Sequence, residues 1–478
     1  MRGQAMVLGA VLLLVLCIGA LLIFNTGQVV NKKVQLTNAA DAAAYSVAIQ
    51  QAQAWNFAAY MNRGRVANEV AVAQVISIYS WMNQLNTSSY VLKTVFQILS
   101  YIPFPPVSVP ARVLYTIFNA ADQSLQQARK VYHPIAENAV KILDEFNGIY
   151  ARAAEIAIRY SSKIEALDIA SDVVKANAPK ASIGGVALGV LGMQLVNAER
   201  TFLAFHPRPR QNQRSAAFDR YRNVVMQSRD RFSWNRGDKV MLGPIGFASY
   251  GGTDMVEYSR WAALDTMQLK IKLPWPMDDI DVPVGWGGAQ AVEKFRNQAF
   301  LPGIRSGRNN TAGWYSDYDR RTHGIYGGMN GRDAVTRLAA NDPNVSVHNG
   351  KAKGAYFEKY NGLRAYHDVK PSKFTGPEDG PVFTVQAEMD VREARTSTAI
   401  GMGAGSMQLA DKAADNKLKA LASAQVYFNR PGDYALFRRG DNKLEKGSLF
   451  NPYWQARLVE TPLSVRGMLG VTGSLGSP

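Results

Sequence analysis

Cysteine and charged residues are scarce in this chain of 478 residues, which has one cysteine and 19% charged residues. A single cysteine excludes a disulfide-bonded scaffold and a cysteine-based zinc site. The apolar content of 47% excludes an intrinsically disordered protein. The chain is too long for one ordinary core, so we expect two or three structural units. The net charge of +16 directs attention to nucleic acid, an anionic membrane or a polysaccharide.

Motifs that carry catalysis are also missing from the sequence. It contains no H-E-x-x-H zinc motif, no G-x-S-x-G nucleophile turn and no G-x-x-x-x-G-K-[ST] phosphate loop. The glycines of Gly401–Gly405 lack the third glycine of the dinucleotide-binding spacing, which favours a turn before a helix. Asp278, Asp279 and Asp281 share one loop, but no glutamate completes a calcium-binding set, so a solvated turn is favoured. We predict a non-enzymatic protein without catalytic, cofactor-binding or metal-ligating residues.

An apolar segment lies at the N-terminus, where Ala5–Phe24 contains no charged or strongly polar side chain. At about 1.5 Å per residue, a helix of this length spans roughly the 30 Å hydrocarbon core of a bilayer. The alternatives are a cleaved signal peptide and a buried core helix. A signal peptide has a shorter apolar region and a small-x-small cleavage site, and neither is found here, so an uncleaved anchor is favoured. Cys17 lies inside this segment and is interpreted as a buried, inert thiol.

Charges are scarce after the anchor, and no proline occurs before Pro103. Between Val34 and Ala111 the charged residues are Asp41, Arg63, Arg65, Glu69 and Lys93. This stretch is rich in alanine, a strong helix former. We predict that the membrane helix continues, with breaks near Gly27 and Gly64, into a long Ala-rich helical stalk. The small alanine side chains predict close packing, against later helices of the same chain or against another subunit.

Prolines predict where this helical region is interrupted. Tyr101–Pro110 predicts a firm break, because each proline disfavours helix before it and removes a hydrogen-bond donor. Arg112–Lys175 resumes a helical pattern, and a new helix is expected to begin at Pro134. The apolar and glycine-rich Ser182–Val196 is too short to span a membrane, which favours a buried connector or helix.

Positive charge is concentrated between His206 and Lys239, which contains nine basic and three acidic residues with aromatic residues between them. Such a segment can bind an anionic polymer, and the candidate contacts are Arg220, Arg222, Arg229 and Arg231. The alternative is a solvated, Arg-rich linker and helix face whose arginines pair with the protein's own carboxylates, and this is the favoured interpretation. Nucleic acid is the least favoured partner, because no recognised nucleic-acid-binding module surrounds the segment.

The composition of the sequence changes after Trp234, where glycine, proline, tryptophan and tyrosine become frequent. Alternating patterns in Met267–Pro274, Pro381–Val391 and Ala424–Pro431 predict strands, and Ser397–Ala424 predicts in part a helix. The fold class is therefore α+β: a single N-terminal transmembrane helix continues into a long Ala-rich helical stalk, followed by a C-terminal region of mixed strands and helices. The predicted segments are a membrane anchor (1–25), a helical stalk or domain (26–200), an Arg-rich connector (201–239) and an α+β domain (240–478).

The N-terminal residues resemble a known family. R-G-Q-A (Arg2–Ala5), the apolar segment and Q-L-T-N-A-A-D-A-A-A (Gln35–Ala44) resemble the TadE/TadG-like assembly proteins of tight-adherence (Flp-type) pili. Phe450–Glu460 is similar, more weakly, to the ends of long TadG-like proteins. The resemblance implies a single-pass protein of the bacterial inner membrane with a periplasmic body. It also implies a scaffold or minor pilus subunit in assembly and secretion, and hence in adhesion and biofilm formation.

The implied partners are other pilus-assembly membrane proteins or pilin-like subunits, together with the lipid bilayer. The implied assembly contacts are Asn38, Asp41 and Trp55, although Asp41 could equally be a carboxylate on the wet face of a helix. Cleavage after Gly3, as in pilins, would place Leu8 where pilins carry a glutamate, which does not support pilin-like polymerisation. The D-x-S-x-S metal motif of von Willebrand A domains, found in many TadG-like proteins, is also absent.

A second hypothesis comes from another class of protein. The chain could be a membrane-anchored periplasmic module that binds cell-wall or surface polysaccharide. Its binding residues would be the Arg-rich segment and the loops near Trp275, Trp286 and Trp314.

Overall fold

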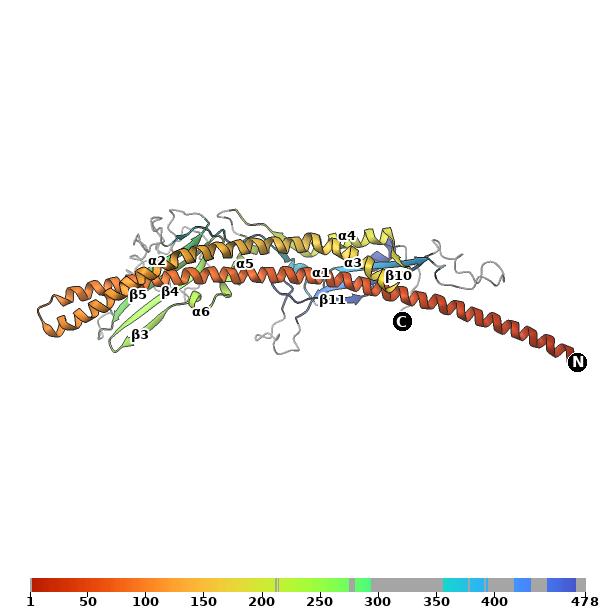
Figure 1. The fold of residues 1–478 in the computed structure, drawn as a ribbon, viewed down its shortest axis with the longest axis horizontal. Helices are drawn as coiled ribbons and strands as arrows, with labels where there is room; N and C mark the ends of the chain where they lie inside the picture. The colour runs from red at the N-terminus through yellow and green to blue at the C-terminus, as the bar shows by residue number, and fades with distance from the viewer. Residues whose placement is uncertain are drawn as a thin grey trace. The chain divides into compact units, whose positions relative to one another are not determined.

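The computed structural model describes residues 2–210, 213, 215–274, 280–293, 356–376, 379–390, 393, 417–430 and 445–469, and it confirms the α+β fold class (Figure 1). The chain forms two compact units, each built from separated stretches. Unit 1 comprises Met1–Asn62, Arg152–Phe205 and Tyr366–Pro478. Unit 2 comprises Arg63–Ala151 and His206–Ala365. Each unit thus brings together stretches that lie far apart in the sequence. The four predicted segments remain a prediction from composition.

The first helix, α1 (Arg2–Ser100), is 99 residues long and unbroken, so the predicted breaks near Gly27 and Gly64 are wrong. A glycine in a helix interior costs only about 1 kcal/mol relative to alanine, which packing outweighs. At Gly64 that packing is visible, because a Cβ there would lie 3.0 Å from Cε2 of Tyr150. The glycine allows the tyrosine ring of the following helix to lie directly on the backbone of α1.

The predicted proline break is confirmed but shorter, since only residues 101–104 separate α1 from α2 (Pro105–Ile156). Pro134 lies inside α2, so the prediction that it begins a new helix is wrong. The neighbouring turn is held by packing: Ala136 and Val140 are buried, and the Tyr132 hydroxyl donates a hydrogen bond to the Val75 carbonyl at 3.1 Å. A π-helical turn (Ala157–Ser161) then leads into α3 (Ser162–Asn177).

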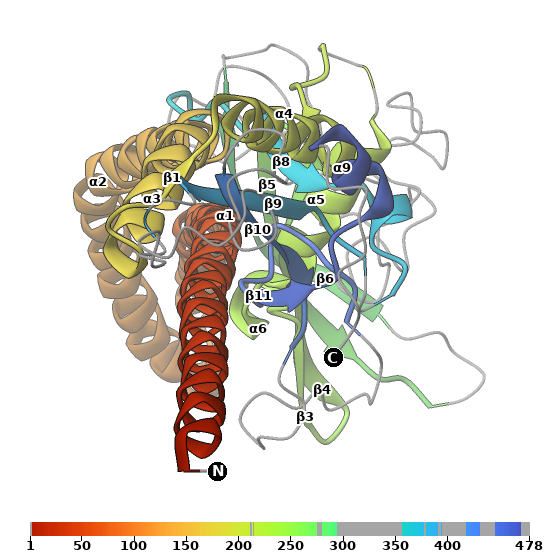
Figure 2. The ribbon, with the colours of Figure 1, turned by 90° about the vertical axis from the view of Figure 1, so that its right-hand side faces the viewer.

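Unit 1 contains a four-stranded antiparallel sheet in the order β1-β9-β10-β11. Helix α4 (Gly185–Phe202) packs on β9 and against α3, as Figure 2 shows, so Ser182–Val196 is largely helical. The short strands β2 and β8 form a separate pair. The remaining bounds are β1 (Ser182–Ile183), β2 (Leu203–His206), β8 (Tyr366–Val369), a 3₁₀ turn (Pro371–Lys373), β9 (Val382–Asp390), β10 (Lys417–Phe428), β11 (Trp454–Val459) and α9 (Leu463–Met468).

Strands predicted in this part of the sequence are confirmed by β9 and by the end of β10. The helix predicted within Ser397–Ala424 is wrong from Lys417 onward, because Lys417–Ala424 belongs to β10. The earlier residues of that prediction, 397–416, lie outside the described residues. Strand β10 pairs with β9 on one side and β11 on the other, and these two ladders outweigh the helix propensity of its alanines.

Unit 2 contains a five-stranded sheet in the order β3-β4-β5-β6-β7, antiparallel except for β6 and β7. Helices α5 and α6 pack against β4, and the strand predicted at Met267–Pro274 is confirmed as far as Ile271. At Gly287 of β6, a Cβ would overlap the backbone of α1 at Ser80 and Gln84, so glycine is needed for this contact. The bounds are α5 (Ala216–Gln227), α6 (Arg231–Trp234), β3 (Asp238–Leu242), β4 (Ile245–Glu257), β5 (Arg260–Ile271), β6 (Ile280–Val292) and β7 (Tyr356–Phe357).

Candidate assembly helix and Arg-rich segment

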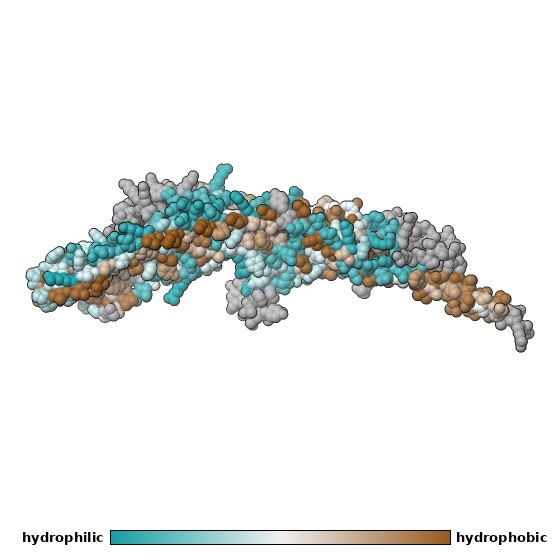
Figure 3. Space-filling model, viewed as in Figure 1, coloured by the Kyte–Doolittle hydropathy of each residue, from teal (hydrophilic) through white to brown (hydrophobic). Residues whose placement is uncertain are grey.

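The N-terminal part of α1 has its apolar side chains exposed on all sides. Met6 is 81% exposed, Leu16 68% and Ile23 76%, and none of the most apolar window is buried. A core helix of a soluble protein would be mostly buried, so that interpretation of Ala5–Phe24 is excluded. Figure 3 shows this end of the chain as a hydrophobic surface. Among the described residues, α1 alone has a stretch long and apolar enough to cross a membrane.

Burial begins abruptly at Leu36, where one face of α1 enters the core of unit 1. The buried residues recur at intervals of three and four, which is the spacing of one helix face. Most are alanines, and this allows the α1 backbone to approach its neighbours closely. They pack with alanines of α3 and with the sheet residues of unit 1. The buried apolar residues of α1 in unit 1 are Leu36, Ala39, Ala40, Ala43, Ala44, Val47, Ala48, Ala52, Ala54, Trp55, Ala58 and Ala59.

Polar contacts fix α1 just before this buried face. The Lys33 ammonium group donates a hydrogen bond to the Lys419 carbonyl at the start of β10. The Gln35 side chain donates to the Asn177 carbonyl at the end of α3, at 3.1 Å. Burial lowers the pKa of Lys33. The helix is therefore attached to both the sheet and α3 of unit 1 within a few residues of its exposed segment.

The three predicted assembly contacts have different environments. Asn38 is exposed, whereas Asp41 is half-buried, and its burial raises the pKa of its carboxyl group. Trp55 is 2% exposed, and its ring makes an edge contact with Trp454 at 4.7 Å between ring centroids and with Phe374 at 6.1 Å. The Trp55 side chain therefore forms part of the core of unit 1, while Asn38 and Asp41 lie nearer the surface.

Three arginines of the Arg-rich segment form ion pairs inside unit 2. Arg236 forms a two-bond ion pair with Asp265, with Nε–Oδ1 at 2.6 Å and Nη2–Oδ2 at 3.0 Å. Arg229 pairs with Asp254, and both side chains are nearly fully buried. Arg208 pairs with Glu293 at 2.8 Å. Pairing with the protein's own carboxylates, the interpretation favoured from sequence, describes these three arginines.

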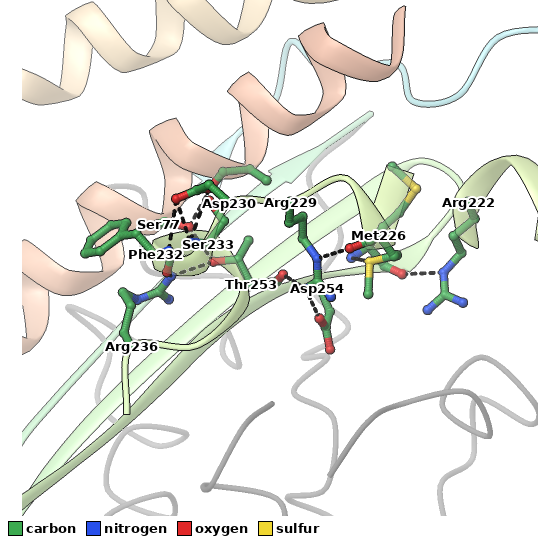
Figure 4. A network of polar contacts seen from close by, with 12 residues as sticks. Ser77, Arg222, Met226, Arg229, Asp230, Phe232, Ser233, Arg236, Thr253 and Asp254 are labelled. Atoms are coloured by element: carbon green, nitrogen blue, oxygen red, sulfur yellow. Dashed lines mark hydrogen bonds and ion pairs between the residues drawn. The ribbon is translucent and has the colours of Figure 1, made fainter. Parts of the chain in front are cut away.

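Figure 4 shows how this network connects α6 to β4 and to α1. Asp230 caps α6 by accepting hydrogen bonds from the backbone of Phe232 and Ser233, which lowers the Asp230 pKa against the opposing effect of its burial. The Arg236 guanidinium donates to Thr253 at 3.1 Å, and Thr253 shares a 2.6 Å hydrogen bond with Ser77 of α1. The sequence predicts these pairs on a solvated face, whereas the structure buries Arg229 and Arg236 with their carboxylates and connects Arg236 through Thr253 to α1.

The four predicted anionic-partner residues divide into two pairs. Arg222 is 2% exposed, and its Nε donates to the Met255 carbonyl at 2.6 Å, while Arg229 is held by Asp254. Arg220 and Arg231 are exposed. The structure thus does not bring all four arginines to one surface, and a contact with an anionic partner remains a prediction for Arg220 and Arg231.

A buried carboxyl group that the sequence analysis missed lies on α1 in unit 2. Glu69 is 1% exposed and accepts hydrogen bonds from Trp261 Nε1 at 3.0 Å and the Tyr360 hydroxyl at 2.7 Å on one oxygen. Its other oxygen accepts from Asn147 of α2 at 2.9 Å. Burial is the main reason that the pKa of Glu69 rises to about 7, against the opposing hydrogen bonds. Its position in a nearly uncharged helix was the signal that could have identified it.

A second buried carboxyl group, Asp144 of α2, lies close to Glu69. It forms an ion pair with Arg364 at 2.5 Å and accepts hydrogen bonds from the backbone and side chain of Asn361 at 3.0 and 2.6 Å. Arg65 of α1 donates to the Arg364 carbonyl at 2.7 Å and lies over the Tyr221 ring at 5.3 Å. Burial raises the pKa of Tyr221 to about 12. These groups form a polar cluster that joins α1 and α2 to the segment after β7.

Metal-binding groups of three or more histidine, cysteine, aspartate or glutamate residues do not occur in the described part of the chain. Asp281 and Trp286 belong to β6. The other residues considered from sequence, Asp278, Asp279, Trp275, Trp314 and Gly401–Gly405, lie outside the described residues.

Comparisons with known proteins identify one region of similarity. No curated protein and no solved structure matches the chain. The model of the Tad family, described as Flp pilus-assembly TadE/G-like, matches residues 3–53. The matched region is about a tenth of the chain and lies entirely within α1 and unit 1. The resemblance inferred from Arg2–Ala5 and Gln35–Ala44 is thereby confirmed: the N-terminal segment of this protein is Tad-like.

Proposed function

We propose that the protein is a non-enzymatic component of a tight-adherence-type pilus assembly apparatus. In this proposal the start of α1 anchors it in the bacterial inner membrane, its body lies in the periplasm, and it acts as a scaffold or minor pilus-associated subunit. One observation carries the proposal. The Tad-like residues 3–53 include both the exposed apolar segment of α1 and most of the alanine face buried in unit 1.

The continuity of α1 supports a scaffold role. The helix passes from its exposed apolar segment into the core of unit 1 without a break. A lateral contact made by the apolar segment in the bilayer is therefore coupled rigidly to the folded unit. Gly9 and Gly19 offer open positions at which another membrane helix could approach closely. The proposed partners are other pilus-assembly membrane proteins or pilin-like subunits.

Asn38 and Asp41 are the proposed contacts outside the bilayer. They lie one turn apart on α1, Asn38 is exposed, and Asp41 is only half-buried. A partner that donates a hydrogen bond to the Asp41 carboxylate would offset its partial desolvation. Trp55 is not proposed as a contact, because its ring is packed in the core of unit 1.

Polysaccharide binding is not proposed. Arg222 and Arg229 are held within unit 2, and Trp275 and Trp314 lie outside the described residues. No geometry in the described part of the chain favours that function.

The anchor can be tested by replacement in the bacterium that carries the gene. In one variant the residues up to Phe24 are replaced by a cleavable signal peptide, and in a matched variant by an unrelated single-pass helix of the same length and orientation. Piliation is scored by electron microscopy and by the amount of sheared pilin. We expect piliation to be lost in the variant whose body is released from the membrane. The foreign helix would restore it if tethering suffices, and would not if the native helix makes specific contacts.

Two further outcomes bear on the same proposal. Normal piliation after deletion of the whole gene would overturn it. Protease digestion of the body in spheroplasts, but not in intact cells, is the expected sign of a periplasmic location, and protection in both would contradict that location.

The contact residues are tested by Asn38→Ala and Asp41→Asn, with Gln53→Ala as the control, since Gln53 is another exposed polar residue of α1. Protein levels are measured by immunoblot in parallel. We expect piliation to fall in the first two variants with unchanged protein levels, and to be unaffected in the control. Equal piliation in all three variants would remove Asn38 and Asp41 from the proposal.

A further inference from the structure

Glu69 has hydrogen-bonding partners that respond unequally to its protonation. An ionised carboxylate only accepts hydrogen bonds, whereas a neutral carboxyl group must also donate one. The indole of Trp261 and the amide nitrogen of Asn147, which face its two oxygens, can only donate. The Tyr360 hydroxyl, 2.7 Å from Oε2, can both donate and accept. A proton on Glu69 is therefore best placed on Oε2, where Tyr360 can rotate its hydroxyl and become the acceptor.

The surroundings of Glu69 decide which protonation state the fold prefers. The three donors to its oxygens are neutral, whereas the neighbouring Asp144 has its own cation in Arg364. Asp144 disfavours charge on Glu69, Arg65 favours it, and Tyr221 and Tyr360 complete the titratable groups around it. Complete burial disfavours the ionised form most strongly. The folded state thus retains a proton that an unfolded chain releases.

We propose that the Glu69–Tyr360 pair is a pH-sensitive tie that holds the segment after β7 against α1 and α2. With Glu69 neutral the segment is held tightly. When Glu69 ionises, a charge is left in a fully buried cluster and the segment opens more often. This inference stands on unit 2 alone and does not depend on the proposed role in pilus assembly.

The direction of the effect follows from the two pKa values. The Glu69 pKa is about 7 in the folded protein, against an ordinary value of 4.5. Between these values the folded state holds the proton and the unfolded state does not, so protection falls as pH rises through this range. The stabilisation that neutral Glu69 provides is complete below pH 4.5 and is lost above about pH 7.

Hydrogen exchange detected by mass spectrometry tests the tie on the full chain in detergent. Exchange of peptides covering 356–365 and 62–72 is compared at pH 5.5 and pH 8, after correction for the intrinsic effect of pH on amide exchange. We expect opening to be about thirtyfold more frequent at pH 8 than at pH 5.5. Peptides of α1 from Ala52 to Ala59 in unit 1, which contain no titratable side chain, serve as the internal reference and should not change.

Two variants separate Glu69 from other titrating groups. Glu69→Gln removes the titration and should make protection of these peptides independent of pH. Glu145→Gln, on the exposed surface of α2, should keep the wild-type pH dependence. Equal corrected protection of the wild type at both pH values would overturn the proposal, as would an unchanged pH dependence in Glu69→Gln.

Infrared difference spectroscopy of the wild type keeps the proposal testable if Glu69→Gln does not fold. A buried neutral carboxyl group gives a C=O band that disappears on ionisation. We expect this band to be lost as pH rises through about 7, together with a shift of a tyrosine C–O band from Tyr360. Absence of a neutral carboxyl band at pH 6 would overturn the proposal.

Discussion

The two halves of α1 bury surfaces of different composition. Between Leu36 and Ala59, in unit 1, the buried face is mostly alanine, with Leu36, Val47, Trp55 and the polar Gln51. Between Arg65 and Ser88, in unit 2, the buried face is largely polar. Its buried polar residues are Arg65, Glu69, Ser77, Ser80, Asn83, Gln84, Asn86 and Ser88.

The two halves of α1 stabilise their buried faces by different interactions. Alanine has no polar side-chain atoms, so the first half needs only close packing. Buried polar groups are usually hydrogen-bonded, and each buried polar side chain of the second half makes at least one hydrogen bond, although Asn83 Oδ1 accepts none. Ser80 donates to Asp265 at 2.5 Å, Asn83 to the Gly288 carbonyl at 2.9 Å, and Asn86 to Asp122 at 2.7 Å. Unit 1 should therefore be sensitive to lost volume, and unit 2 to lost partners and to pH.

The largest expected effect tests the alanine-packed half. Trp55→Ala removes a ring that contacts Trp454 and Phe374, and we expect a loss of about 3–5 kcal/mol in the stability of unit 1. The control is Phe57→Ala two residues away, since Phe57 is 43% exposed and should cost about 1 kcal/mol or less. The stability of unit 1 is measured by urea denaturation followed by limited proteolysis. Equal losses of stability in Trp55→Ala and Phe57→Ala would show that Trp55 is not a core residue.

A slightly smaller effect tests the ion pairs of unit 2. Arg236→Ala leaves the Asp265 carboxylate buried with Ser80 as its remaining donor from α1, and we expect a loss of about 3 kcal/mol or more. Arg231→Ala, in the same segment but exposed, should change stability by less than about 0.5 kcal/mol. The urea midpoints of unit 2 for the two variants check this. If they coincide, Arg236 is not part of a buried pair.

The pH dependence of stability should distinguish the two units. Glu69 lies in unit 2, and its pKa is about 7 in the folded protein, against an ordinary value of 4.5. Unit 2 should therefore lose up to about 3 kcal/mol between pH 4.5 and pH 7.5, since one pKa unit corresponds to about 1.4 kcal/mol. Urea midpoints of both units, measured across this range, check the prediction. A parallel decline in unit 1 would remove the contrast between the two halves of α1.

The smallest expected effect concerns a single hydrogen bond between α1 and β4. Ser77→Ala removes the 2.6 Å contact with Thr253 and the bond to the Ala73 carbonyl within α1. We expect a loss of about 1 kcal/mol from unit 2, measured by its urea midpoint. Ser100→Ala removes only a hydrogen bond to the Gln97 carbonyl at the end of α1, and is the control with an expected change of less than about 0.5 kcal/mol. If Ser77→Ala does not lower the stability of unit 2, the view that unit 2 depends on individual polar contacts is weakened.

Much of the fold could be predicted from local sequence. The apolar run Ala5–Phe24, the alanine spacing after Leu36 and the alternating pattern of Pro381–Val391 are each visible within one element. The prediction failed where distant residues decide the outcome. Lys417–Ala424 forms a strand because β9 and β11 pair with it, and Pro134 lies within a helix because α2 is packed on both sides of it.

The candidate site shows the same division between sequence and structure. The sequence by itself determined the exposed apolar segment of α1 and the Tad-like residues after it, because hydrophobicity and helical spacing are local properties. Only the tertiary structure decided that Trp55 is a core residue, that Arg229 and Arg236 are used internally, and that Glu69 is buried. Burial and pairing depend on which segments meet in space, and those partners lie far away in the sequence.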